Sequence, residues 1–306
     1  MSEKSKKVNF TFSYGELEDG SIWIEPPSGR LFRIDKYTLG VILDLERGLS
    51  KEEVLKKYHL TDEELEEALR KFSLEKAIVN YGEGKINYRP KIRDISLKGF
   101  FLVFIILWLI QLEYFRYFAH TFSLNSWQDS IIIIVAGISA IFFHELGHYL
   151  VARKYFKPKL GFCFLFIFPA VYVDTQKAWT LPRNIRILIN SAGIFADFVI
   201  NVLVVTLVVN FPRWERLVTP FLITQYTRLS LVVNPLFTTD GYWILSDLTK
   251  TVNLRKVAIE NLKRLKFNLF SFYGILSIWM MVVSILGVIW LIFNIFKRAI
   301  LRLSLG

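Results

Sequence analysis

Residues 131–152 read IIIIVAGISAIFFHELGHYLVA, an apolar run that carries one glutamate and two histidines near its end. About 20 consecutive apolar residues suffice to cross a bilayer as a helix, so the run predicts a transmembrane helix. The pentapeptide from His144 to His148 has the spacing H-E-x-x-H, which puts two imidazoles on one helix face. There both can bind one zinc ion, with Glu145 beside them as a general base. Such polar groups are costly inside a membrane, which favours a functional site over a chance match.

The composition indicates a membrane protein with several spans. The chain has 306 residues, of which 53% are hydrophobic, and its mean hydropathy is +0.38. Several long uncharged stretches are typical of a multi-pass α-helical membrane protein. The sole cysteine, Cys163, excludes a disulfide within the chain and a zinc site built from cysteines. We predict about five spans, at residues 98–118, 130–152, 187–211, 217–237 and 268–296.

A further apolar stretch, residues 160–173, is interrupted by Pro169. It is too short to cross a bilayer, so we predict a re-entrant or interfacial segment.

The positive charge is concentrated in the membrane half of the chain. Residues 1–96 hold 17 Lys and Arg against 18 Asp and Glu, whereas the whole chain carries a net charge of +11. The excess flanks the apolar spans, as expected for contacts with lipid headgroups. Its distribution predicts a protein of the cell membrane whose N-terminus lies on the cytoplasmic side. A DNA-binding head would be clearly basic, so no nucleic-acid partner is expected.

Residues 1–96 predict a small soluble α+β domain, and residues 97–306 a membrane domain. In the first, a β-hairpin is followed by three short helices and a closing strand, which is a winged-helix pattern. The expected elements are strands at 8–12, 21–25, 30–34 and 76–81, a helix at 35–47, helices that begin after Ser50 and Thr61, and a linker rich in Gly and Lys.

A catalytic zinc site needs a third protein ligand and an open position. The best remaining carboxylate is Asp240, which follows a helix break expected at Pro235. Asp240 could instead cap a helix. Three weaker candidates could line a cavity or contact substrate: Asn234, Asp174 and Asp197, the last of which could pair with Arg228.

The motif His144 to His148, followed by Asn234-Pro235 and Asp240-Gly241, resembles the site-2 protease family of intramembrane zinc metalloproteases. Residues 168–174, 191–193 and 240–247 are similar to segments of its bacterial peptide zinc metalloprotease branch.

This resemblance implies a Zn²⁺ ion bound by His144, His148 and Asp240, with Glu145 as the base. The chain departs from the family at Ile194, where the family often has proline, and at Asp197, where it often has asparagine. The first 96 residues are similar to winged-helix peptide-recognition domains of the PQQ-chaperone type, which bind a leader peptide at a sheet edge.

The favoured hypothesis is an intramembrane zinc endopeptidase that matures a small, ribosomally made and modified peptide, with residues 1–96 recruiting the leader. Two alternatives remain open. One is regulated proteolysis of a membrane-bound regulator. The other is a non-enzymatic membrane receptor or immunity protein with a DNA-binding head.

Overall fold

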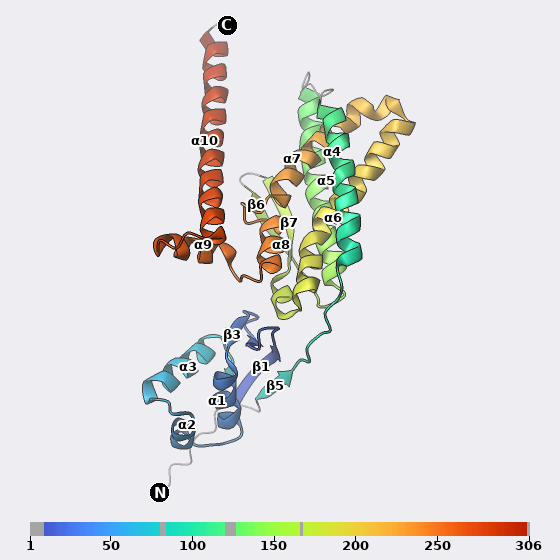
Figure 1. Ribbon diagram of the computed structural model, residues 1–306. Coiled ribbons are helices and arrows are strands. Elements are labelled where there is room, and N and C mark those ends of the chain that lie inside the picture. Colours follow the sequence, from blue (N-terminus) through green and yellow to red (C-terminus); the bar gives the residue numbers. More distant parts are fainter. Residues whose placement is uncertain (1–8, 80–83, 120–126, 166–167, 305–306) are drawn as a thin grey trace. The chain divides into compact units, whose positions relative to one another are not determined.

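The computed structural model describes residues 9–79, 84–119, 127–165 and 168–304, and the chain forms two compact units (Figure 1). The N-terminal unit consists of Met1–Ile95 and Thr175–Ile185, and the membrane unit of Ser96–Asp174 and Arg186–Gly306. Helices make up 66% of the structure, and a small α+β region lies at the N-terminus, as predicted.

The N-terminal unit contains a five-stranded sheet and three helices. Strands run in the order β3-β2-β1-β4, and β5 pairs in parallel with β1. The elements are β1 (Asn9–Glu16), β2 (Ile22–Glu25), β3 (Phe32–Ile34), α1 (Lys36–Glu46), α2 (Lys51–Tyr58), α3 (Asp62–Leu74), β4 (Ile78–Val79) and β5 (Lys85–Tyr88).

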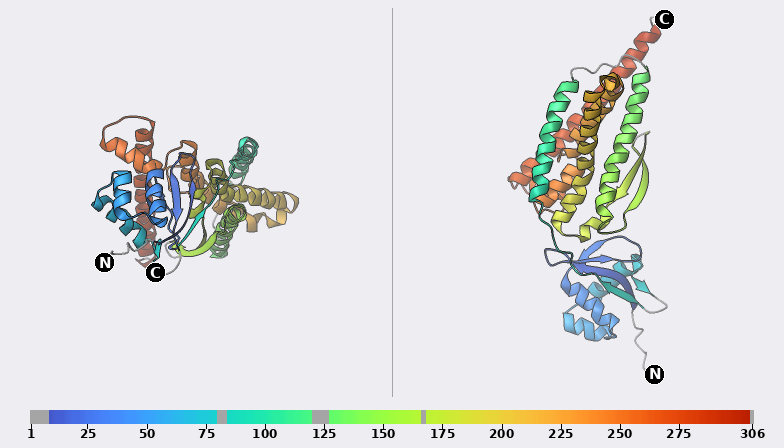
Figure 2. Two further views of the ribbon diagram at one scale, coloured as in Figure 1. Left: turned by 90° about the horizontal axis from the view of Figure 1, so that it is seen from below. Right: turned by 90° about the vertical axis from the view of Figure 1, so that its right-hand side faces the viewer.

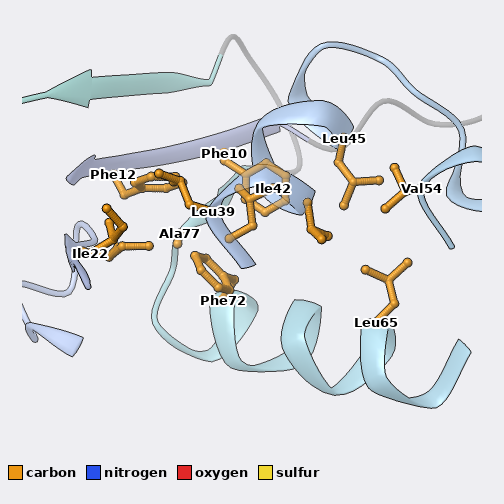
Figure 3. Packing of buried hydrophobic residues seen from close by; sticks show 12 residues of the cluster. Phe10, Phe12, Ile22, Leu39, Ile42, Leu45, Val54, Leu65, Phe72 and Ala77 are labelled. Carbon is orange, nitrogen blue, oxygen red and sulfur yellow. The ribbon is translucent and has the colours of Figure 1, made fainter. Parts of the chain in front are cut away.

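The core of this unit lies between the sheet and the three helices. Phe10 and Phe12, on one face of β1, are 0% and 2% exposed, and both rings pack against Phe72 of α3 (Figure 3). Alternate residues of a strand point to opposite faces, which explains why the alternating pattern in this segment predicts a half-buried strand.

The helix boundaries of this unit agree with the sequence prediction. Ser50 and Thr61 each form a capping box with the glutamate three residues later, which satisfies backbone N–H groups that the helix itself cannot pair. Strand β5 was not predicted, because its four residues lie in a stretch assigned to the linker. Residues 80 and 81 of the expected closing strand lie outside the described residues.

A later segment, Thr175–Ile185, also belongs to the N-terminal unit. Lys177 Nζ lies 2.5 Å from Glu25 Oε1, and the backbone N–H of Arg183 donates to Glu18 Oε1 at 3.0 Å. The domain boundary predicted at residue 96 assigns this segment to the membrane domain instead. The sequence does not reveal the grouping, because the contacts of the segment are with residues far away in the chain.

The membrane unit consists mainly of long helices (Figures 1 and 2). Helices α4, α5 and α6 run alongside one another in Figure 2, and α7 packs against both α4 and α5. The elements are α4 (Lys98–Ala119), α5 (Trp127–Ala152), β6 (Lys159–Leu165), β7 (Phe168–Asp174), α6 (Arg183–Asn210), α7 (Glu215–Val233), α8 (Asp240–Leu248), α9 (Leu254–Lys263) and α10 (Leu269–Ser304), with short 3-10 turns at Gln176–Thr180 and Pro212–Trp214.

Three helices are long and apolar enough to cross a membrane within the part of the chain that the structure describes: Ile131–Ala152, Arg183–Asn210 and Leu269–Gly287. They correspond to the second, third and fifth predicted spans. Helices α4 and α7 lie where the first and fourth spans were expected, but neither is among the three. The prediction of five spans is therefore not confirmed.

Helix α5 exposes its apolar residues and buries its polar ones, the reverse of a helix in a soluble protein. His144 and His148 are 5% and 6% exposed. The exposed face is made of Ile131, Ile134, Val135, Ile138, Phe142, Leu146 and Leu150. Such an arrangement suits a helix whose outer surface meets lipid.

The segment predicted as re-entrant or interfacial is an antiparallel ribbon of β6 and β7. Strand β7 packs against α5, as Figure 2 shows. Residues 166 and 167 of this segment lie outside the described residues. The ribbon pairs its own backbone groups, which is one way to satisfy non-helical backbone next to apolar surroundings.

One polar cluster lies at the edge of the N-terminal core. Asp44 of α1 is 5% exposed, and its Oδ2 accepts hydrogen bonds from Lys57 Nζ at 2.6 Å and Tyr58 Oη at 2.8 Å. These bonds, led by that from Lys57, hold the pKa of Asp44 below its ordinary value. A carboxylate stabilised in this way contributes to folding only while it is ionised.

Replacement of this carboxylate, Asp44→Asn, is expected to lower the free energy of unfolding of the N-terminal unit by about 1–3 kcal/mol. The stabilisation is present above the unfolded pKa of about 4 and is lost as the pH falls through the lower folded pKa. Hydrogen exchange of α1 and α2 in the full-length chain, corrected for intrinsic rates at each pH, measures both effects. Equal protection of variant and wild type at pH 7 would contradict the assignment, and the exposed Glu67→Gln serves as a control.

Candidate metal centre

The two histidines of α5 point into one buried site. The Nε2 atoms of His144 and His148 lie 3.2 Å apart, and their rings pack edge to face with centroids at 4.8 Å. Residues four apart on a helix lie on the same face, so the sequence spacing alone brings the rings together. Helix α6 and the start of α8 cover this face.

Asp240, the first residue of α8, supplies a third candidate ligand atom. Its Oδ2 lies 2.9 Å from His144 Nε2 and 3.2 Å from His148 Nε2. Zinc bound by nitrogen and oxygen at about 2.0–2.2 Å in a tetrahedron separates its ligand atoms by roughly 3.3 Å. The three atoms therefore form a triangle of the size that one zinc ion requires, and the set of two imidazoles and a carboxylate suits that metal.

In its ionised form the carboxylate of Asp240 would offer a negatively charged oxygen to a metal, which is the state in which carboxylates bind metal ions.

A break between α7 and α8 brings Asp240 to the histidines. Helix α7 ends at Val233, and Asn234 Oδ1 accepts a hydrogen bond from the N–H of Leu236 at 3.0 Å. A Cβ at Gly241 would lie 2.0 Å from the carbonyl oxygen of Val233, so only glycine fits there. The predicted break at Pro235 is confirmed.

Side chains from α9 and α10 bind the carbonyl groups that this break releases. Tyr273 Oη donates to the carbonyl of Pro235 at 2.9 Å. Arg255 Nη2 and Ser277 Oγ donate to that of Leu236 at 2.8 and 2.9 Å. Carbonyl groups without partners are unfavourable in an apolar environment, so these bonds fix the loop before Asp240.

The second ring nitrogen of each histidine has its own acceptor on α6. His148 Nδ1 lies 2.8 Å from the carbonyl oxygen of Ile189, and His144 Nδ1 lies 2.8 Å from Asp197 Oδ2. An acceptor at Nδ1 places the ring proton there and leaves Nε2 with its lone pair free for a metal. Asp197 also forms an ion pair with Arg228 of α7, the pairing that the sequence analysis considered.

A glycine of α6 keeps the space beside the two ring nitrogens open. A Cβ at Gly193 would lie 2.5 Å from His148 Nε2 and 2.6 Å from His144 Nε2, closer than any real contact. A second glycine, Gly147 on α5, lets the two helices approach, since its Cβ would lie 2.4 Å from the carbonyl oxygen of Ala192. The residues present therefore leave room for an ion at the histidines.

Glu145, the expected base, lies next to His144 on α5 and accepts a hydrogen bond at Oε2 from the N–H of Val173 on β7, at 2.7 Å. This bond orients the carboxylate from outside its own helix. Asp174, the following residue, is not part of the group of three candidate ligands in the described chain. Sequence reasoning missed the backbone groups of Ile189 and Val173, because neither depends on the identity of the side chain.

Comparison with known proteins gives one partial relative. No family model matches the chain, and no solved structure matches it. Over 124 residues, 39% of the chain, it is 35% identical to the "Putative peptide zinc metalloprotease protein YydH" of Bacillus subtilis (strain 168). The match covers 48% of that protein, so the chain spans about half the length of its curated relative.

Substitution of the glycine that faces the rings, Gly193→Ala, is expected to weaken zinc binding by at least about tenfold, the scale of other changes around a metal centre. The new methyl group would occupy the space beside both Nε2 atoms. Zinc bound per chain, measured by mass spectrometry of the metal after dialysis against a weak chelator, tests this. Gly287→Ala is the matched control, since a Cβ there meets nothing within 4 Å; full zinc occupancy in Gly193→Ala would refute the placement of the site.

Proposed function

We propose that this chain is an intramembrane zinc endopeptidase of the site-2 protease type, with its metal centre at His144, His148 and Asp240. One observation carries the proposal: two imidazole Nε2 atoms and one carboxylate oxygen, from helices far apart in sequence, lie 2.9–3.2 Å from one another. The partial relative from Bacillus subtilis, named a "Putative peptide zinc metalloprotease protein", supports the same class of reaction.

The two histidines would hold the ion through Nε2 and Asp240 through Oδ2. A bound zinc ion supplies Lewis-acid chemistry, which polarises the scissile carbonyl and makes a water molecule acidic near neutral pH. Glu145 accepts the proton of the attacking water and passes it to the amine nitrogen, while the new carbon–oxygen bond forms and the carbon–nitrogen bond breaks. The substrate must enter as an extended strand, since a helix hides its carbonyl groups.

The burial of the ligands serves this chemistry. His144 and His148 are almost fully buried, so charge that develops at the centre is little screened by bulk water. The N–H of Val173 fixes the carboxylate of Glu145 before substrate arrives. A base held in place loses less freedom in the transition state than a mobile one.

We further propose a small precursor peptide as the substrate, recruited through its leader by the N-terminal unit. Strand β3 pairs only with β2 among the described strands, so one edge of β3 is open for an added strand. Backbone hydrogen bonds at such an edge give affinity for an extended peptide. The near-neutral charge of residues 1–96 suits a peptide partner better than DNA.

The proposed location is the cell membrane, with the N-terminal unit on the cytoplasmic side. The three apolar helices support a membrane protein. Basic residues around the predicted spans support the orientation, because lysine and arginine are enriched in cytoplasmic loops. A precursor made in the cytoplasm would then meet the N-terminal unit first.

The decisive variant is Glu145→Gln, which removes the base but leaves all three candidate ligands in place. It is expected to keep bound zinc and to lower cleavage by about 10²–10⁴-fold, the usual contribution of a general base. Peptide precursors encoded beside the gene, co-expressed with the full-length chain and followed by mass spectrometry, provide the substrates. The same precursors without their leaders should be cut more slowly.

The exposed Glu113→Gln on α4 is the matched control and should cut at the wild-type rate. Cleavage at the wild-type rate by Glu145→Gln would remove Glu145 from the reaction. Equal cleavage of precursors with and without leaders would count against recruitment by the N-terminal unit, but not against the peptidase itself.

A further inference from the structure

Asp197 is a carboxylate buried inside the membrane unit. It is 0% exposed, and it lies on α6. Burial of an ionised carboxylate is unfavourable unless charges and hydrogen bonds compensate it. Each of its oxygens has such a partner: Oδ2 lies 2.8 Å from His144 Nδ1, and Oδ1 pairs with Arg228 Nη2.

Arg228 reaches this carboxylate from α7 and has a second partner there. Its Nη2 donates to Gln225 Oε1 at 2.9 Å, and the glutamine is itself fully buried. The positive guanidinium offsets the charge of Asp197, so the pair adds no net charge to the membrane interior. The result is a connected series from Arg228 through Asp197 to His144, whose Nε2 faces Asp240.

The two histidines differ in the group that accepts the hydrogen bond from Nδ1. His148 Nδ1 meets the neutral backbone carbonyl of Ile189, whereas His144 Nδ1 meets a charged carboxylate. A hydrogen bond to a charged acceptor is roughly twice as strong as one between neutral groups. His144 is therefore held more firmly in orientation and tautomer than His148.

We infer that Asp197 is a positioning residue: its carboxylate fixes the tautomer and orientation of His144 and sets the zinc affinity of the centre. Arg228 has a separate role: its positive charge offsets the unfavourable burial of the carboxylate and so stabilises the fold. The inference rests on the proposed metal centre, but it does not require that the centre cleaves peptides. Zinc affinity should depend on the charge at position 197. Stability should depend on whether the charges of Asp197 and Arg228 are both present or both removed.

Three variants of the full-length chain in detergent separate these roles: Asp197→Asn, Arg228→Gln and the two combined. Asp197→Asn should bind zinc about 10–100-fold more weakly, as when other acceptors behind metal ligands are lost, and should also unfold at lower temperature because Arg228 loses its partner. Arg228→Gln should be less stable but bind zinc no more weakly than the wild type. The double variant should regain stability and keep the weak zinc binding.

Zinc affinity is measured by competition with a chromogenic chelator at one pH, and stability by thermal unfolding. The absorption spectrum of the Co²⁺-loaded chain adds a readout of ligand geometry, which should change in Asp197→Asn and in the double variant only. Asn201→Ala is the control: Asn201 lies one turn along α6, is fully buried and donates to Gln111 at 3.0 Å. It should lose stability and keep wild-type zinc affinity.

Wild-type zinc affinity in Asp197→Asn would overturn the inference. So would an affinity that recovers in the double variant together with stability, because the loss would then be one of folding alone. A wild-type chain that binds no zinc would overturn both this inference and the proposed function. A chain that binds zinc as described but cuts no precursor would contradict only the peptidase.

Discussion

Two imidazoles four residues apart on an apolar helix need partners that the helix cannot supply, and α6 provides both. Its Ile189 carbonyl and Asp197 carboxylate accept from the two Nδ1 atoms, and Gly193 between them leaves the Nε2 side open. These three positions are four residues apart along α6 and so lie on one face. The match between the faces of α5 and α6 is the constraint on which the centre depends, because an unpaired polar group is costly where water is absent.

The remaining elements position the third candidate ligand, Asp240, beside the two histidines. The break after α7 lets the chain turn so that α8 begins at Asp240 beside the histidines. Arg255, Ser277 and Tyr273 hold this loop through hydrogen bonds to its carbonyl groups. Arg186 of α6 forms a buried ion pair with Asp247 of α8. Helix α6 therefore contacts both histidines and also the helix that carries the carboxylate.

The parts of the site that depend on side-chain identity and spacing could be predicted from the sequence. His144 and His148 are paired by helix geometry, and Pro235 marks the break that precedes Asp240. Gly193 could not be assigned a role, because a glycine matters here only through the helix that lies opposite. The acceptor for His148 is a backbone carbonyl, which any residue at position 189 would offer.

Some elements of the fold could be predicted from the sequence, whereas others could not. The caps at Ser50 and Thr61 define α2 and α3 by local hydrogen bonds, so short-range patterns suffice for them. The β6–β7 ribbon and β5 form through pairing with other strands, which apolar content alone does not reveal. The place of Thr175–Ile185 in the N-terminal unit likewise depends on contacts with residues more than one hundred positions away.

The most direct test of the metal centre is X-ray absorption at the zinc edge on the full-length, zinc-loaded chain. We predict one zinc ion per chain, bound by two imidazole nitrogens and at least one carboxylate oxygen at about 2.0–2.2 Å, with no sulfur ligand. A shell with fewer than two imidazoles, or with sulfur at about 2.3 Å, would contradict a centre formed by His144, His148 and Asp240.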